Sequence, residues 1–382
     1  LSGSVDPRGR SMSLDNDSNE TPQVWRTALS EKQYPTHYVG EKACEFLKDQ
    51  DNTPFALVVS FPDPHHPFTP PGRYFDLYDP SEIPLPKSFS HRIKDRSDLP
   101  KHIQRIYEIG AEKPGLIDSN GNVRDLSTVV SEINGDALSE SSLTKLNDIE
   151  IDSLNVVPGN PRLGLPISGT PKLICIGLNY SDHAKESNMP IPTEPVVFMK
   201  AISALNGPSD DVILPDNSVK GDWEVELAVV IGSTAKKVNE SEALAHVAGY
   251  TICNDVSERE WQLEHGNQWS KGKSFDTFAP VGPWLVTKDE INDPQNLAMW
   301  LDLNGKRMQT GNTNTMIFGV EKLISYLSHF VTLQPGDIIS TGTPPGVGMG
   351  VKPEPVFLKI GDEMRLGIDG LGEQKQNVIA GK

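Results

Sequence analysis

From residue 172 onward, apolar residues recur in short runs with the two-residue period of β-strands. The run at 223–231 is the clearest, because it is rich in β-branched and aromatic residues. Similar runs predict strands at 173–178, 195–200, 249–253, 284–286, 298–303, 338–340, 357–358 and 364–368. Helical spacing predicts helices at 241–248 and 320–330. Many short strands with few helices favour a mixed α+β, β-rich fold with a rolled sheet over a doubly wound sheet.

The first third of the chain has a different pattern. Residues 1–34 are rich in Ser, Asp, Asn, Pro and Gly, which predicts disorder or loose coil. A helix is expected at 39–48 and a buried strand at 54–60, and the polar cluster at 119–122 between apolar runs predicts a hairpin. We therefore expect a partly disordered extension over 1–104, a small N-terminal subdomain over 105–168, and a larger domain with the candidate chemistry over 169–382.

Composition and charge narrow the possible partners. The 382 residues contain no run of ~18 apolar residues, so no transmembrane helix is expected. A net charge of −17 argues against nucleic acid or an anionic membrane as a partner, because both require a basic surface. The three cysteines form no C-x-x-C pair, which favours reduced, buried thiols and a cytoplasmic protein. The chain begins with Leu, as expected of a fragment or a processed chain, and no signal-peptide pattern follows it.

Two acids lie inside the predicted strand at 223–231. Alternation along a strand places Glu224 and Glu226 on one face, roughly 7 Å apart, and turns Trp223, Val225 and Leu227 toward a core. Adjacent carboxylates repel each other, and a cation between them removes that cost. Their hard oxygen atoms suit magnesium, calcium or manganese. From these two residues alone, however, an ordinary solvated sheet face is the better interpretation.

A third acid follows the next predicted strand. Asp255 lies at a strand-to-helix junction, where it serves either as a helix N-cap or as a further metal ligand. Arg259 and Gln262 come four and seven residues later and share its helical face. These two side chains are suited to hold a substrate carboxylate or carbonyl.

Three further candidates have simple alternative explanations. His183 and Glu186 are three residues apart, so the carboxylate can orient the imidazole for activation of water, although a surface helix carries such pairs too. Lys273 by itself is best explained as a solvated lysine. The loop at 341–348 is too rich in proline for a phosphate-binding P-loop. It is either a plain connecting turn or a tight loop that offers backbone N–H groups and the hydroxyl of Thr343 to an anionic substrate.

Together these positions carry a family resemblance. Residues 107–382 resemble the fumarylacetoacetate hydrolase family, and the resemblance rests on motifs that occur in order along the chain. The motif residues are Asn179, Tyr180, His183 and Glu186; Asp222, Trp223, Glu224 and Glu226; Asn254, Asp255, Ser257, Arg259 and Gln262; Lys271, Lys273 and Asp276; and the glycine-rich run at 341–348. The resemblance implies the family's mixed β-roll, a homodimer formed through the catalytic domain, and Mg2+ or Mn2+ at the site.

The resemblance also implies a role for each residue and a reaction. It makes Glu224, Glu226 and Asp255 the metal ligands, His183 and Glu186 the water-activating pair, Lys273 the group that stabilises an enolate, and Arg259, Gln262 and Thr343 the substrate contacts. The implied reaction is metal-dependent hydrolysis of a C–C bond in a 2,4-diketo acid, either an acylpyruvate or a sugar acid such as 2,4-diketo-3-deoxy-L-fuconate. The substrate is then a small anionic 2-oxo acid. Because the sequence also resembles members labelled ureidoglycolate lyase, release of glyoxylate and urea is the alternative.

A second, shorter resemblance lies upstream. Residues 38–89 resemble a piece of a sulfatase, in which a Pro-His-x-Pro turn, here with His65, brings a histidine to the sulfate group. A sulfatase also needs a C/S-x-P-x-R motif for its nucleophile, and the chain contains none. We therefore expect an inactive remnant. A residual sulfatase and a non-catalytic scaffold are less favoured, because the motif set of the fumarylacetoacetate hydrolase family is complete.

Overall fold

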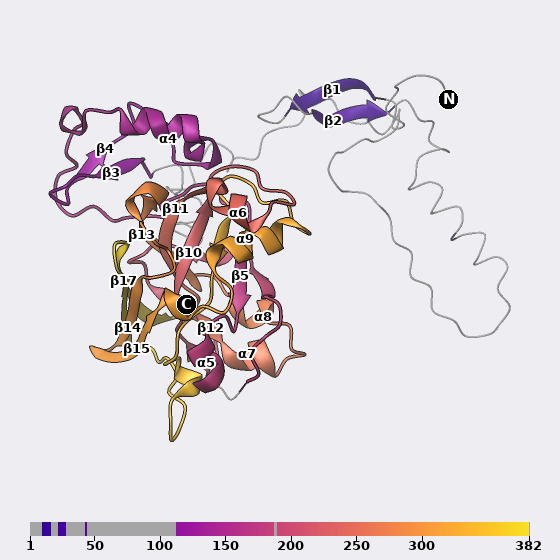
Figure 1. Ribbon diagram of the computed structural model, residues 1–382, viewed down its shortest axis with the longest axis vertical. Helices are drawn as coiled ribbons and strands as arrows, with labels where there is room; N and C mark the ends of the chain where they lie inside the picture. The colour runs from indigo at the N-terminus through magenta and orange to yellow at the C-terminus, as the bar shows by residue number, and fades with distance from the viewer. Residues whose placement is uncertain (1–9, 17–21, 28–42, 44–111, 187–188, 382) are drawn as a thin grey trace, which may run out of the picture. The chain divides into compact units, whose positions relative to one another are not determined.

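The computed structural model describes residues 10–16, 22–27, 43, 112–186 and 189–381. The chain divides into two compact units, Leu1–His91 and Arg92–Lys382. In the first unit, strands β1 (Arg10–Asn16) and β2 (Pro22–Thr27) pair antiparallel (Figure 1). They occupy a stretch for which the sequence predicts coil. Because apolar residues alternate with serines at 11–14, the pattern there is that of a strand.

Several expectations for the first third of the chain fall on residues that the structure does not describe. The predicted strand at 54–60 lies there, as do the predicted helix at 39–48 and the sulfatase-like segment, apart from residue 43. The domain boundaries at 104/105 and 168/169 remain predictions.

A seven-stranded mixed sheet forms the centre of the second unit (Figure 1), in the order β6-β5-β16-β10-β11-β13-β7. These strands are β5 (Leu173–Gly177), β6 (Val196–Lys200), β7 (Leu205–Asn206), β10 (Val225–Ile231), β11 (Val247–Asn254), β13 (Ala279–Thr287) and β16 (Ile338–Ser340). Strand β10 is antiparallel to both of its neighbours, β11 and β16, and each of its residues is buried. The predicted strand at 223–231 is thus the middle of the sheet, beginning two residues later than expected.

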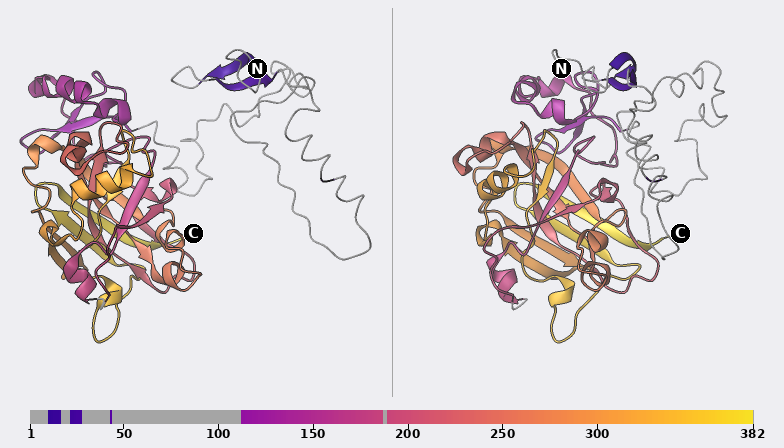
Figure 2. Two further views of the ribbon diagram at one scale, coloured as in Figure 1. Left: turned by 45° about the vertical axis from the view of Figure 1, so that its right-hand side comes forward. Right: turned by 90° about the vertical axis from the view of Figure 1, so that its right-hand side faces the viewer.

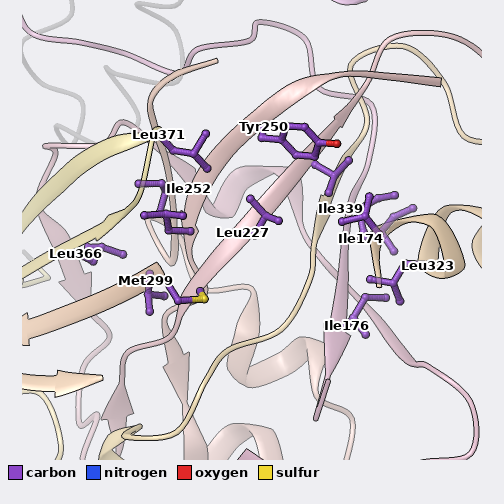
Figure 3. Close-up of a cluster of buried hydrophobic side chains, with 14 of the residues drawn as sticks. Ile174, Ile176, Leu227, Tyr250, Ile252, Met299, Leu323, Ile339, Leu366 and Leu371 are labelled. Atoms are coloured by element: carbon purple, nitrogen blue, oxygen red, sulfur yellow. The ribbon is translucent and has the colours of Figure 1, made fainter. Parts of the chain in front are cut away.

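A five-stranded sheet, ordered β15-β14-β17-β18-β8, packs against the first, and the two views of Figure 2 show them together. Its strands are β8 (Val212–Leu214), β14 (Ala298–Leu303), β15 (Lys306–Asn312), β17 (Glu363–Ile368) and β18 (Gly372–Ala380). The main apolar core lies between the sheets, and Figure 3 shows Leu227, Ile252 and Met299 within it. A curled, β-rich mixed fold with few helices confirms the predicted architecture.

The opposite face of the central sheet carries a second apolar cluster. Ala228, Val230 and Cys253 lie there, and Leu138 and Ile167 from the N-terminal part of the unit cover them. That part contains the predicted hairpin, β3 (Gly115–Ile117) with β4 (Val123–Asp125), the helix α4 (Glu140–Asn147), and the 3-10 turns η5 (Gly135–Leu138) and η6 (Ile151–Ser153). Every residue of β10 is buried because both faces of the sheet are covered.

Short helices and turns connect the strands. They are α5 (Ser181–Glu186), η7 (Ile202–Ala204), α6 (Glu240–Ala243), η8 (Leu244–His246), α7 (Arg259–Leu263), α8 (Ser270–Lys273), η9 (Lys288–Glu290), η10 (Thr313–Thr315), α9 (Val320–Ser328) and η11 (Gly348–Gly350), with a two-stranded ladder of β9 (Gly221–Asp222) and β12 (Ser257–Glu258). None of the described helices has the length and apolar character needed to cross a membrane.

Two local predictions are wrong. The helix expected at 241–248 ends early, because Val247 already pairs with Ile231 as the first residue of β11. Residues 357–358 form no strand, although the Leu358 N–H donates to Gly221 O at 2.7 Å. At residue 247, pairing with Ile231 outweighs the local pattern of apolar residues.

Candidate active site

Three buried carboxylates converge where β10 begins and β11 ends. Glu224 and Glu226 flank Val225, the first residue of β10, and Asp255 directly follows β11. The antiparallel pairing places Val225 opposite Asn254, and the Asp255 N–H donates to Glu224 O at 2.9 Å. One oxygen from each carboxylate lies within 4.8 Å of the others, and the three residues are 1–7% exposed. The structure therefore brings together the three acids that the sequence nominates and does not place them on a solvated face.

Two predicted cations neutralise this cluster. Lys273 Nζ lies 2.7 Å from both Glu224 Oε2 and Asp255 Oδ2, and Arg259 Nη2 lies 2.6 Å from Glu224 Oε1. Lys273 is only 2% exposed, so its interpretation as a solvated lysine is wrong. Lys273 lies on α8, which starts after Trp269. The indole of Trp269 packs against Gly177, where a Cβ on that glycine would lie 2.2 Å from the ring.

The acids differ in how readily they ionise. Burial disfavours the charged form of Glu224, but the charges of Lys273 and Arg259 outweigh that effect and lower its pKa to about 2. Burial, reinforced by the charges of Asp255 and Glu224, raises the pKa of Glu226 well above its ordinary value. Burial opposes the charge of Lys273 as well, yet the neighbouring Asp255 and Glu224 raise its pKa above the ordinary value. The cluster thus contains one carboxyl group whose pKa is raised and one whose pKa is lowered, beside a lysine whose pKa is raised.

The donor set fits a divalent cation. Carboxylate oxygens are the ligands that Mg2+ and Mn2+ prefer, and convergent buried acids are stable when a cation joins them. The Glu226 Oε2 atom already accepts hydrogen bonds from Ser340 Oγ (2.6 Å) and the Gly342 N–H (3.0 Å), which fix its direction. Glu224, Glu226 and Asp255 would hold the ion.

The predicted water-activating pair is also formed. His183 and Glu186 lie on α5, with His183 Nδ1 3.2 Å from Glu186 Oε2, and the Gly346 N–H donates to the same oxygen at 3.2 Å. The hydrogen bond from His183 is the main reason that the pKa of Glu186 is lowered. The carboxylate of Glu186 thereby holds the His183 ring in one orientation.

The loop at 341–350 joins the pair to the carboxylates. Its N–H groups donate to three acids: Gly342 to Glu226, Gly346 to Glu186, and Gly348 and Met349 to Asp222. The sequence left open whether this loop offers its N–H groups to an anionic substrate, but these four groups bind carboxylates of the protein. The loop thereby fixes the positions of a metal-ligand candidate and of the His183–Glu186 pair.

The predicted substrate contacts lie next to this cluster. Gln262 Oε1 accepts a hydrogen bond from Arg259 Nη1 at 2.9 Å, so the two side chains form one unit on α7. Arg259 Nε also donates to Asp222 Oδ2 at 2.8 Å. The Thr343 hydroxyl lies 2.9 Å from Val225 O and accepts from Gln309 Nε2. Their roles as substrate contacts remain predictions.

Sequence reasoning missed one cation of this cluster, Lys200. Lys200 ends β6, its side chain is fully buried, and its Nζ lies 2.5 Å from Asp255 Oδ1 and 2.9 Å from Val256 O. The signal was present in the alternation of the strand, which places Lys200 on the same face as the buried Phe198. A lysine on an inward face is rarely buried without an acidic partner.

One prediction arises from the loop. Gly346 has φ +101°, and a Cβ on it would lie 2.0 Å from Met308 O. Gly346→Ala is therefore expected to lower the free energy of unfolding by more than about 2 kcal/mol, because left-handed strain and a backbone clash add. Urea denaturation followed by tryptophan fluorescence measures the change.

The matched control for this prediction is Gly305→Ala. Gly305 also has a positive φ, +76°, in the turn between β14 and β15, but a Cβ on it would have no heavy atom within 4 Å. The Gly305→Ala protein should lose only about 1–2 kcal/mol of its free energy of unfolding. Equal losses for the two variants would show that the contact with Met308 is not important.

Comparisons with known proteins find a family model and relatives that this chain resembles. Residues 172–379 match the family model described as fumarylacetoacetate (FAA) hydrolase C-terminal. A 2,4-didehydro-3-deoxy-L-rhamnonate hydrolase of Sphingomonas sp. (strain SKA58) is 59% identical over 274 residues, which cover 72% of this chain and 94% of that protein.

Solved structures give the same result. Fumarylacetoacetate hydrolase from Exiguobacterium antarcticum is 37% identical with a TM-score of 0.62, and the match covers 70% of this chain and 95% of that one. Maleylpyruvate hydrolase from Sphingobium sp. SYK-6, in complex with manganese(II) and pyruvate, is 31% identical with a TM-score of 0.59, covering 70% and 96%.

Proposed function

Because this chain belongs to the fumarylacetoacetate hydrolase family, we propose that it is a divalent-metal-dependent hydrolase that cleaves a C–C bond in a 2,4-diketo acid. The observation that carries the proposal is the buried convergence of Glu224, Glu226 and Asp255. The hydrogen-bonded pair of His183 and Glu186 supports it, since it supplies a base for water, and one loop contacts both groups.

The substrate class that we propose is the diketo-deoxy sugar acids. The Sphingomonas relative is named for 2,4-didehydro-3-deoxy-L-rhamnonate. Oxidation at carbons 2 and 4 and loss of the hydroxyl at carbon 3 leave carbon 5 as the single stereocentre of a 6-deoxy sugar acid. L-rhamnonate and L-fuconate share their configuration there, so the sequence-based candidate, 2,4-diketo-3-deoxy-L-fuconate, is the same molecule, 5-hydroxy-2,4-dioxohexanoate.

The reaction consumes one water. Glu224, Glu226 and Asp255 would hold a divalent cation, which would supply Lewis acidity to the 2-oxo acid end of the substrate. His183, held by Glu186, takes a proton from water, and the resulting hydroxide adds to the carbonyl at carbon 4. The bond between carbons 3 and 4 breaks, and its electron pair stays on carbon 3 as an enolate.

The remaining residues stabilise the products of that cleavage. The ammonium of Lys273, whose charge is firmly held, stabilises the enolate. Arg259 and Gln262 bind the carboxylate end of the substrate. Protonation of carbon 3 then gives pyruvate, and carbons 4 to 6 leave as lactate, so that water and substrate together account for both products.

We propose Mg2+ or Mn2+ as the metal and a homodimer as the assembly. The manganese in the Sphingobium relative and the all-oxygen donor set support the choice of metal.

Exposed apolar side chains support the homodimer. Val219, Val356 and Ile360 are among them, and they lie around a groove of about 610 Å3. Light scattering on the purified chain measures the assembly, and a monomer at micromolar concentration would contradict it.

The function is tested with the whole chain and a substrate panel. Purified protein with Mg2+ or Mn2+ is expected to remove the enol absorbance of 5-hydroxy-2,4-dioxohexanoate and to release pyruvate, detected with lactate dehydrogenase and NADH. Chelation by EDTA should stop the reaction, and added metal should restore it. Cleavage of ureidoglycolate to glyoxylate and urea, with diketo acids untouched, would contradict the proposal.

A further inference from the structure

Gln309 is a fully buried amide that reaches the start of the metal-ligand strand. It lies on β15, in the second sheet, and is 0% exposed. Its Oε1 accepts a hydrogen bond from the Val225 N–H at 3.0 Å. Its Nε2 donates to Thr343 Oγ1 at 2.8 Å and to Pro344 O at 2.9 Å. This amide therefore joins the first residue of β10 to the glycine-rich loop.

Thr343 closes a ring around Val225. Its hydroxyl donates to Val225 O at 2.9 Å and accepts a hydrogen bond from Gln309 Nε2. The Val225 N–H is therefore bound by Gln309 and the Val225 carbonyl by Thr343. Strand β16 pairs with β10 only from Ala228 onward. The two side chains thus occupy the place of the strand partner that is missing beside Val225.

The ring controls the direction of two carboxylates. The Val225 N–H belongs to the peptide unit that follows Glu224, and the Val225 carbonyl belongs to the unit that precedes Glu226. Hydrogen bonds to both groups fix both peptide planes, and the planes set the direction in which each neighbouring side chain leaves the strand. Val225 itself turns its side chain into the core.

We propose that Gln309 and Thr343 are a positioning pair that holds Glu224 and Glu226 in the orientation required to bind a divalent cation. The inference rests on the metal site of the proposed function. It assigns the hydroxyl proton of Thr343 to Val225 O. Since a substrate carboxylate only accepts hydrogen bonds, Thr343 then acts on the ligands of the metal and not as a donor to the substrate.

The test measures Mn2+ binding to the whole chain, without substrate, from the electron paramagnetic resonance signal of free Mn2+. Gln309→Met and Thr343→Val are each expected to weaken binding about 10–100-fold, the effect typical of side chains that orient metal ligands. Thr343→Ser keeps the hydroxyl and should restore affinity to near that of the unsubstituted chain. Gln295→Met is the matched control, because that amide also joins two backbone groups, Val320 N and Thr313 O, but makes no bond to β10.

The outcomes separate this inference from the proposed function. A folded Gln309→Met protein with unchanged Mn2+ affinity overturns the positioning role of Gln309 and Thr343. An unsubstituted chain that binds no Mn2+ overturns it as well. If Gln309→Met fails to fold, the Mn2+ affinities of Thr343→Val and Thr343→Ser test the positioning role instead. Equal Mn2+ affinities of these two variants overturn it. An unsubstituted chain that binds Mn2+ but leaves diketo acids intact contradicts the proposed function alone.

Discussion

Glu226→Gln is expected to weaken Mn2+ binding by more than about 100-fold and to reduce diketo acid cleavage to background. Side chains that merely orient metal ligands change metal affinity about 10–100-fold, so loss of a ligand charge should cost more. Glutamine retains the shape of the side chain and an oxygen that can accept from Ser340 Oγ and the Gly342 N–H, so the fold should persist. Isothermal titration calorimetry and the pyruvate assay measure the two effects.

The same residue predicts a pH dependence of metal binding. Burial and the charges of Asp255 and Glu224 raise the pKa of Glu226, so a proton must leave before its carboxylate binds a cation. Affinity for Mn2+ should therefore increase as pH rises, with release of a proton that calorimetry in buffers of different ionisation enthalpy detects. Affinity that does not change with pH would contradict the raised pKa of Glu226.

A buried acid outside the triad provides the control. Asp337 is 0% exposed, forms an ion pair with Lys172 at 2.7 Å, and also has a pKa raised by burial. Asp337→Asn should leave Mn2+ affinity unchanged even if it changes stability. An equal loss of Mn2+ affinity in Asp337→Asn and Glu226→Gln would mean that the effect comes from the fold and not from a ligand.

His183→Asn is expected to lower kcat for diketo acid cleavage by about 10²–10⁴, the usual contribution of a general base. Mn2+ affinity should remain, because the hydrogen bond described for the His183 ring is made to Glu186 and not to the carboxylate triad. Glu186→Gln should lower kcat less, since it removes the negative charge beside the His183 ring but leaves the ring in place. Steady-state kinetics at saturating metal measures both changes.

Another histidine gives the control for this prediction. His246 ends η8, and its ring nitrogen Nδ1 forms a hydrogen bond with Ser233 Oγ at 2.9 Å, away from the carboxylate triad. His246→Asn should therefore leave kcat unchanged. A His183→Asn protein with full activity would remove the water-activating role from the pair and leave the base to be found elsewhere.

Local pattern was sufficient for much of the fold. Strand β14 was predicted with its observed ends, and Asn304 and Gly305 form the turn after it, both residues having positive φ. The predicted helix at 241–248 was too long, because the sequence there remains apolar after β11 has already begun. Propensity and periodicity describe neighbours along the chain, whereas strand ends depend on partners that lie far away in sequence.

The sequence by itself determined which side chains are available for chemistry and on which face of β10 the two glutamates lie. It left open whether Glu224 and Glu226 face water or a metal. Only the tertiary structure decided against water, by placing Asp255 and Lys273 against them in a buried cluster.

The tertiary structure also supplied the side chains that sequence reasoning missed. Lys200 meets Asp255 across 55 residues and Gln309 meets Val225 across 84. A local pattern carries no information about such partners, because the approach of the two segments depends on how the sheets pair and pack. The requirement that each buried charge or amide find a partner then fixes where these residues bind.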